Sequence, residues 1–284
     1  MNATAVKASA LFLALVVNVP FALTPANSQT ADLVVRSVLR VCADPANIPF
    51  SNKKRQGFEN KLAQLFGQKL GIPVIYSWFP QMTGFIRNTL RARKCDVVIG
   101  YSQGHELVQN TNHYYRSSYV LIYRKNSDLA GVETLSDERL KNKKIGVIAG
   151  TPPASVLATN GLMGNAKPFQ LMVDTRFFSP SEQMANEVAS GELDAGLLWG
   201  PIGGYFAKKS KVPLAVVPLV KEKNGPRMVY RITMGIRRDE RDWKRQLNRL
   251  ISDNQDEINA LLLDYGVPLL DEQDKLIAAS RQSK

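Results

Sequence analysis

The 284-residue sequence lacks the motifs that mark most catalytic and nucleotide-binding proteins. It contains no Gly-x-Ser-x-Gly, no dinucleotide glycine fingerprint and no phosphate-binding loop. Histidine occurs only at His105 and His113, and neither has the cysteine or His-x-x-x-His partner that a zinc site requires. We therefore expect no catalytic residue, and no metal or cofactor held by this chain.

Long apolar runs are missing after the N-terminus. There, Lys7 precedes an apolar stretch over residues 8–23, and Ala26-Asn27-Ser28 offers small residues at the two positions that a signal peptidase inspects. The run is short for a membrane anchor and is interrupted by asparagine and proline. We predict a signal peptide over residues 1–28, no membrane span after processing, and a bacterial periplasmic location.

Acidic residues are too few to balance the basic ones, which leaves a net charge of +12, or +11 once Lys7 is removed with the signal peptide. A chain this basic usually binds nucleic acid, but an exported protein does not meet nucleic acid. The positive charge therefore indicates an acidic protein partner or an anionic surface, or it is a general property of the surface with no target.

Short apolar strands alternate with helical patterns in the same way in two halves of the chain. In the first half, Leu39–Ala43 leads through a helix to Cys95–Gly100; in the second, Lys144–Ala149 leads through a helix to Leu193–Gly200. Such units indicate parallel sheets covered on both faces. We predict an α/β fold of two doubly wound lobes that face a central cleft, joined by a hinge of two crossings.

The remaining patterns divide the chain further. A long β-rich stretch, Tyr114–Tyr123, is expected to carry the chain out of the first lobe, and a helix is expected from Gly84 to about Lys94. Ser179, Pro180 and Glu182 carry the signature of a helix start. The predicted division is a signal peptide (1–28), lobe 1 (32–124 and 228–268), lobe 2 (125–227) and a polar C-terminal tail (269–284).

Only two cysteines are present, Cys42 and Cys95. In an exported chain they predict one disulfide, because the strands that carry them are expected to be neighbours. Closing that loop would favour the folded state by roughly 4 kcal/mol. A parallel register could separate the two residues, which leaves two buried free thiols as the alternative.

The loops at the carboxyl ends of the parallel strands should line the cleft. These loops are aromatic and, apart from Asp44, nearly uncharged. The candidate ligand-cleft residues are Asp44, Asn47, Phe50, Phe79, Gln81, Tyr101, Thr151, Trp199 and Tyr205.

The bilobal pattern resembles type II periplasmic solute-binding proteins, and especially the J-type proteins encoded with periplasmic PQQ-dependent methanol dehydrogenases. The resemblance covers about residues 39–268. It rests on Val41–Pro45, Ile48–Asn52, Gly57–Asn60, Cys95–Gly100, Tyr114–Ser117, Thr151–Ala154, Trp199–Lys208 and Met234–Arg238. It implies an accessory role beside a lanthanide- or calcium-type dehydrogenase and its cytochrome c, and no catalytic residue.

Two departures from amino-acid-binding relatives argue against an amino-acid ligand. Those proteins usually place an arginine for the ligand carboxylate after the third strand, where this chain has Tyr101–Glu106. They place an aspartate for the ammonium where Trp199-Gly200 stands here. Both charges of an amino acid would be buried without partners, which is costly.

Three functions are consistent with the sequence. We favour a non-catalytic accessory or assembly protein that docks on a quinoprotein methanol dehydrogenase through exposed basic residues, among them Arg87, Arg91, Arg93, Arg237 and Arg238. The second is a receptor of an ABC importer for a small neutral or aromatic ligand. The third is an enzyme, for which Asp44 and Glu59 are the only acid–base candidates near the cleft.

Overall fold

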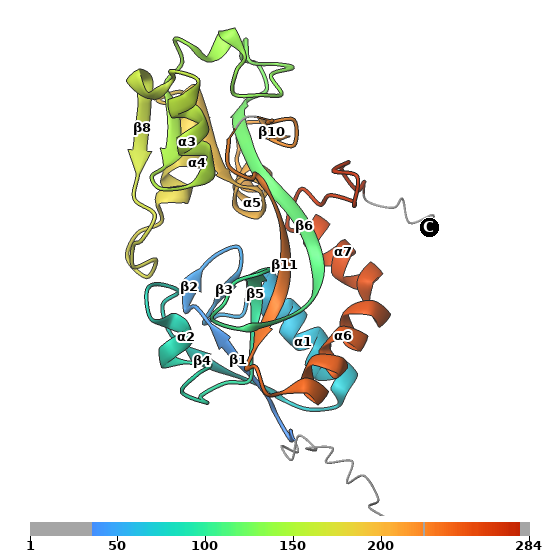
Figure 1. Cartoon of the computed structure of the whole chain (residues 1–284). Coiled ribbons are helices and arrows are strands. Elements are labelled where there is room, and N and C mark those ends of the chain that lie inside the picture. Colours follow the sequence, from blue (N-terminus) through green and yellow to red (C-terminus); the bar gives the residue numbers. More distant parts are fainter. Residues whose placement is uncertain (1–35, 224, 279–284) are drawn as a thin grey trace, which may run out of the picture.

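The structure, a computed structural model, describes residues 36–223 and 225–278. The predicted signal peptide lies outside these residues. Two lobes stand one above the other and are joined by long strands (Figure 1). The predicted α/β fold with two lobes is confirmed. In the described ranges, no helix is both long enough and apolar enough to cross a bilayer.

The sheet of lobe 1 has the order β4-β1-β5-β11-β6. Its parallel strands are β1 (Leu39–Ala43), β4 (Val74–Trp78) and β5 (Val97–Ser102), and its antiparallel strands are β6 (Gln109–Arg124) and β11 (Val229–Ile236). A small hairpin, β2 (Ala46–Asn47) and β3 (Ser51–Asn52), follows β1. The helices are α1 (Phe58–Leu70), α2 (Phe85–Asn88), α6 (Arg241–Asp253) and α7 (Gln255–Asp264).

The sheet of lobe 2 continues from the far half of β6 in the order β6-β9-β7-β8, and β10 pairs with the other edge of β6. Its strands are β7 (Ile145–Ile148), β8 (Ala166–Phe169), β9 (Ala195–Trp199) and β10 (Leu214–Pro218). Its helices are α3 (Pro152–Thr159), α4 (Pro180–Ser190) and α5 (Gly200–Lys209), with short 3₁₀ turns at Glu138–Leu140 and Met163–Asn165.

The long strand β6 belongs to both sheets. Its first part pairs with β11 as far as Ser118, and its second part pairs with β9 from Tyr119 onward. Both sheets are therefore mixed, whereas the sequence pattern indicated parallel sheets; the antiparallel members are the strands that connect the lobes, together with β10. Because β6 serves both lobes, the limits 32–124 with 228–268 and 125–227 remain our proposed division.

Local sequence signals account for several helix ends. Gly71 ends α1 with a φ of 67°, in the left-handed region that favours glycine. Pro180 opens α4, and the Ser179 side chain accepts a hydrogen bond from the backbone N–H of Glu182 at 3.3 Å. This confirms the predicted helix start.

The helix expected from Gly84 to Lys94 is wrong in length. Helix α2 has four residues and is followed by turns. The Thr89 hydroxyl donates to the Phe85 carbonyl, the backbone leaves the helical region at Thr89, and Arg93 has a φ of 56°. The arginines of this segment therefore do not share one helical face.

The predicted disulfide between Cys42 and Cys95 is confirmed, with the two Cα atoms 5.4 Å apart. Val41 is paired with Val97 in the parallel register, which would place Cys95 well behind Cys42 in a straight strand. The chain bends at Asp96 before β5 begins, and the Asp96 N–H donates to the Arg40 carbonyl at 2.8 Å. This bend brings the two cysteines together.

The described part of the predicted C-terminal tail, residues 269–278, packs on β6. Leu269 and Leu270 are buried. The buried Arg116 guanidinium of β6 donates to the Asp271 carbonyl and to the Asp274 carboxylate, the latter at 2.5 Å. Residues 269–274 are thus bonded to the strand that connects the lobes.

Candidate functional site

A cavity of about 180 Å³ lies between the lobes and is called the cleft cavity below. Five of the predicted cleft residues line it: Asp44, Asn47, Gln81, Thr151 and Trp199. They follow β1, β4, β7 and β9 or end them, as expected of loops at the carboxyl ends of parallel strands. The structure therefore brings these five together, with residues of both lobes facing one space.

Asp44 is buried, and its carboxylate is already bonded to the backbone. It accepts hydrogen bonds from the N–H groups of Ala46 at 2.8 Å and Gln81 at 2.5 Å. The Thr175 hydroxyl reaches it from lobe 2 at 3.4 Å. Asp44 thus holds the loops after β1 and β4 in place and contacts the opposite lobe, a structural role that leaves little of its carboxylate for a ligand.

Other polar side chains of the cleft cavity also bond within the protein. The Thr151 hydroxyl donates to the Ile148 carbonyl at 2.6 Å, and the Asn47 amide donates to the Gln81 side chain at 3.1 Å. A charged ligand would therefore meet groups that are largely satisfied.

Two aromatic side chains, Tyr119 and Trp199, line the cleft cavity. Trp199 lies edge-on to Tyr119 and to Tyr230, with ring centroids 5.4 and 5.8 Å apart, where β9, β6 and β11 meet. Burial, with a smaller contribution from Tyr230, raises the pKa of Tyr119 to about 12, so its hydroxyl stays neutral at physiological pH. This surface suits apolar or aromatic contact.

Glu59 lies in the first turn of α1, with its carboxyl group against Cα of Gly100. It keeps some exposure to solvent, but the protein around it raises the pKa of this carboxyl to about 8, first through desolvation and then through the charge of Asp44. Glu59 does not line the cleft cavity, and Asp44 is engaged by backbone donors. The pair therefore does not present an acid and a base to a common substrate position.

The other four predicted cleft residues lie elsewhere. Phe50 packs edge-on against Phe58 of the lobe 1 core, with centroids 5.3 Å apart. Phe79 packs with Tyr101 on the cluster around the disulfide. Tyr101 also lines a second cavity of about 510 Å³, called the arginine groove below.

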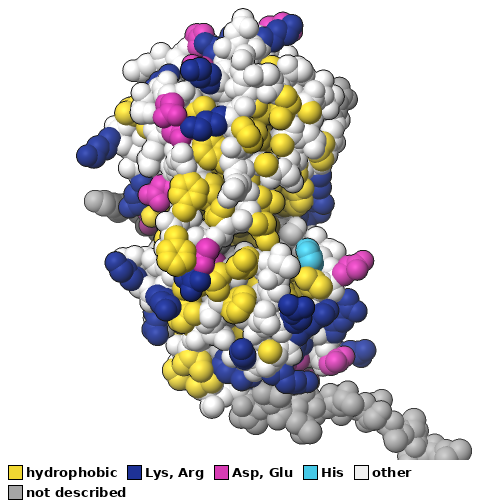
Figure 2. Space-filling view, turned by 90° about the vertical axis from the view of Figure 1, so that its left-hand side faces the viewer, with side chains coloured by type: hydrophobic (Ala, Val, Ile, Leu, Met, Phe, Trp, Pro, Cys, Tyr) yellow, Lys and Arg dark blue, Asp and Glu magenta, His cyan; other side chains and the backbone are white. Residues whose placement is uncertain are grey.

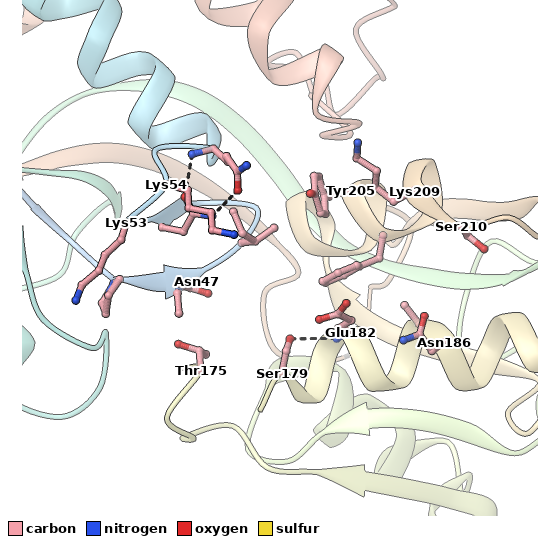
Figure 3. A pocket seen from close by; sticks show the side chains of 17 residues that line it. Asn47, Lys53, Lys54, Thr175, Ser179, Glu182, Asn186, Tyr205, Lys209 and Ser210 are labelled. Carbon is pink, nitrogen blue, oxygen red and sulfur yellow. Dashed lines mark hydrogen bonds between the residues drawn. The ribbon is translucent and has the colours of Figure 1, made fainter. Parts of the chain in front are cut away.

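Tyr205 lines a third cavity of about 600 Å³, called the lysine groove below. Figure 3 shows Asn47, Lys53 and Lys54 of lobe 1 on one side of it and Glu182, Asn186 and Tyr205 of lobe 2 on the other. The Tyr205 ring stacks on Tyr265, with centroids 6.1 Å apart. The lysine groove is polar and opens beside the cleft.

Several residues of the cleft cavity escaped the sequence analysis, chiefly Tyr119 and the loop before α4, with Gln170, Leu171, Met172, Val173 and Thr175. The sequence offered a signal for Tyr119, because it lies in the long β-rich stretch expected to connect the lobes, and such a strand passes beside the cleft between them. The loop carries no motif, and its position depends on the packing of lobe 2.

The end of β9 leaves no room for a side chain. A Cβ atom on Gly200 would lie 2.5 Å from the Ser117 hydroxyl and from the Ser118 carbonyl. An aspartate could not be placed there without moving β6. No arginine follows β5 in the turn at Gln103–Leu107 either. Both observations agree with the sequence argument against an amino-acid ligand.

The predicted docking arginines fall into two groups. Arg87, Arg91, Arg93 and Arg238 are exposed, and Arg238 donates to the Glu106 carbonyl at 2.6 Å. Arg237 is largely buried, so it is not available to bind a partner protein as predicted. Its guanidinium donates to Asp96 at 2.6 Å, and to Glu240.

Asp96 joins this buried network to β1. It also accepts two hydrogen bonds from Arg40, at 2.6 and 2.7 Å. Burial alone would raise the pKa of Asp96, but the hydrogen bonds from Arg40 and Arg237 outweigh it and hold the pKa below its ordinary value. In the described part of the chain, no group of three His, Cys, Asp or Glu residues could hold a metal ion.

Two mixed α/β lobes around a cleft, connected by two strands, define a protein of the periplasmic binding type. Residues 39–265 match the model of the bacterial extracellular solute-binding proteins, family 3. The chain belongs to this family.

Three relatives are similar over nearly the whole chain. Protein MoxJ of Methylorubrum extorquens (strain AM1) is 28% identical over 264 residues, which cover 87% of each protein. The crystal structure of the periplasmic binding protein XoxJ from Methylobacterium extorquens AM1 is 41% identical with a TM-score of 0.71, and that of MxaJ from Methlophaga aminisulfidivorans MPT is 25% identical with a TM-score of 0.70. Both cover 82% of this chain and 100% of the other. The resemblance to the J-type proteins is confirmed.

Proposed function

We propose that this protein is a non-catalytic periplasmic accessory protein that activates or assembles a PQQ-dependent methanol dehydrogenase, with the dehydrogenase's cytochrome c as a further partner. The observation that carries the proposal is the likeness to XoxJ, which extends over the whole of that chain at 41% identity. J-type proteins are encoded with such dehydrogenases, and a likeness of this extent makes a shared role the simplest explanation.

The site supports this role in two ways. Asp44, Thr151, Asn47 and Gln81, which line the cleft cavity, are bonded to one another or to the backbone, as expected of a cleft that is not built around a charged ligand. The net charge of +12 favours association with an acidic protein surface.

The test is binding of the mature protein to a PQQ-dependent methanol dehydrogenase from the same source, at low and at moderate salt. We expect binding that weakens as salt rises, with a change in the dehydrogenase's activity or quinone content. Absence of binding under both conditions would exclude the proposal.

A receptor function is the second candidate, because Tyr119 and Trp199, which line the cleft cavity, suit a small neutral or aromatic ligand. This function requires tight ligand binding and lobe closure. Calorimetric titration with small aromatic and neutral solutes, followed by small-angle scattering with and without the ligand, distinguishes the two.

A further inference from the structure

Large apolar side chains are exposed together at the junction of the lobes. Met82 and Leu107 of lobe 1 and Met172 of lobe 2 line the arginine groove and are 43–56% exposed. On the face that carries α2 and the loop before α4, Figure 2 shows a band of hydrophobic side chains over both lobes, with lysine and arginine beside it on the lower lobe. Contiguous apolar surface of this kind marks an interaction site.

The apolar surface continues beyond the groove along the loop before α4. Leu171 and Phe178 are exposed in this loop, and Phe177 is 84% exposed. The extent of the surface, which runs from the groove out along a loop, fits a polypeptide better than a small enclosed ligand.

The charge of the groove has one sign. Arg87 and Arg91 line it, and in the described ranges neither forms an ion pair. Among the residues that the structure describes, none of those lining the groove is acidic. Two largely buried arginines, Arg116 and Arg237, are instead engaged with carboxylates. The two free guanidiniums are therefore available for bidentate bonds to carboxylates of a partner.

We propose that the arginine groove and the loop at residues 170–178 form the docking surface for a partner-protein segment that carries apolar side chains next to carboxylates. Its apolar side chains enter between Met82, Leu107 and Met172, and its carboxylates bind Arg87 and Arg91. This inference rests on the proposed function, in which the partner is the methanol dehydrogenase. Because the groove has walls from both lobes, docking there bridges the mouth of the cleft.

The lysine groove is the weaker candidate for this segment. It is lined by Lys53, Lys54 and Lys209, but also by Glu182 and by several amide side chains. It offers neither a single charge sign nor a wall of exposed apolar side chains.

Two double variants test the docking surface, each with a matched control elsewhere. Leu107→Ser with Met172→Ser removes apolar contact, and Met163→Ser removes an exposed methionine that does not line the groove. Arg87→Glu with Arg91→Glu reverses the charge of the groove, and Lys209→Glu with Lys211→Glu makes the same charge change on lobe 2. Circular dichroism and thermal melts establish that each variant is folded.

We expect each groove variant to weaken binding to the dehydrogenase about tenfold or more, and each control to change it less than about threefold. The arginine variant should also flatten the salt dependence. If the wild type binds and the groove variants bind as well as the controls, the inference is overturned while the proposed function stands.

If the wild type does not bind the dehydrogenase, the proposed function fails, and a probe decides the inference separately. The probe is a fluorescently labelled peptide of alternating leucine and glutamate, with alternating leucine and lysine as its control. Binding of the acidic peptide that is lost in both groove variants would support the surface for another acidic partner. No binding of the acidic peptide, or binding unaffected by the variants, would overturn it.

Discussion

Gly204 of α5 and Gly266, which follows α7, lie backbone against backbone. A Cβ atom on Gly204 would overlap the Gly266 carbonyl, and one on Gly266 would lie 2.7 Å from the Gly204 carbonyl oxygen. The contact joins lobe 2 to lobe 1 directly. It is reinforced by Lys208, whose ammonium group contacts the carbonyl and the carboxylate of Asp264, the latter at 3.1 Å. This contact holds the two lobes together away from the connecting strands, in addition to the Thr175–Asp44 contact at the cleft.

This contact makes Gly204→Ala a sharp test of how tightly the lobes are packed. The added methyl group must displace the Gly266 backbone, so we expect a loss of about 1–3 kcal/mol in the free energy of unfolding, measured by urea denaturation. Gly164→Ala is the control, because a Cβ atom there meets nothing within 4 Å. Equal stability of the two variants would show that the lobes separate easily at this point.

Removal of the disulfide should destabilise the mature protein. The bridge closes a sequence separation of 53 residues, and its loss in Cys42→Ala with Cys95→Ala should lower the free energy of unfolding by about 2–5 kcal/mol. Wild-type protein treated with dithiothreitol provides an independent comparison. An unchanged denaturation midpoint in both samples would contradict this prediction.

The ion pairs of Asp96 should contribute far more to the free energy of unfolding than an exposed ion pair does. Asp96→Asn removes the carboxylate that Arg40 and the largely buried Arg237 share, and leaves Arg237 only Glu240. We expect a loss of about 3 kcal/mol in the free energy of unfolding. Asp128→Asn, which breaks the exposed pair with Lys143, should change the free energy of unfolding far less.

The Asp96 contribution should also depend on pH. The folded-state pKa lies below the unfolded value of about 3.9, so the stabilisation is present above that pH and is lost as pH falls through the folded pKa. Denaturation of wild type and Asp96→Asn between pH 7 and 3 measures this. A constant difference across the range would exclude the assigned ion pairs as its source.

The contribution of Glu59 to stability should depend on pH in the opposite direction to that of Asp96. Its pKa of about 8 in the folded protein lies above the unfolded value of about 4.3, so the folded state binds the proton more tightly. Stability from this group is therefore fully present below pH 4 and is lost as pH rises towards 8. Glu59→Gln keeps a neutral side chain at all pH values and should gain stability relative to wild type, by about 1–3 kcal/mol, between pH 5 and 8.

The matched control for Glu59 is Glu138→Gln, which changes an exposed carboxyl group. Its stability relative to wild type should stay nearly constant over the same pH range. If Glu59→Gln behaves in the same way, then Glu59 is ionised in the folded protein at neutral pH.

Local sequence signals predicted the parts of the fold that depend on neighbouring residues. The start of α4 at Ser179 follows from capping and from proline at the first helical position. The positions of Asp44 and Trp199 at the cleft follow from a general rule about the carboxyl ends of parallel strands. These inferences need no knowledge of contacts between distant segments.

The parts that could not be predicted depend on such contacts. Arg237 looks like an exposed cation beside Arg238, but only the fold places Asp96, distant in sequence, against it. Arg91 and Arg93 fit a helical pattern, yet the chain leaves the helix at Thr89. Met172 lines the arginine groove only because the loop between β8 and α4 of lobe 2 extends towards lobe 1.

Because β6 belongs to both sheets, it should control how slowly the backbone near Ser118 opens to solvent. Amide protons near Ser118 are held by β11 on one side of the partner change and by β9 on the other. Neither lobe can unfold by itself without breaking pairs at this strand. We therefore expect the amides around Ser118 to be among the slowest to exchange with deuterium, and their exchange to report unfolding of the whole molecule rather than of one lobe.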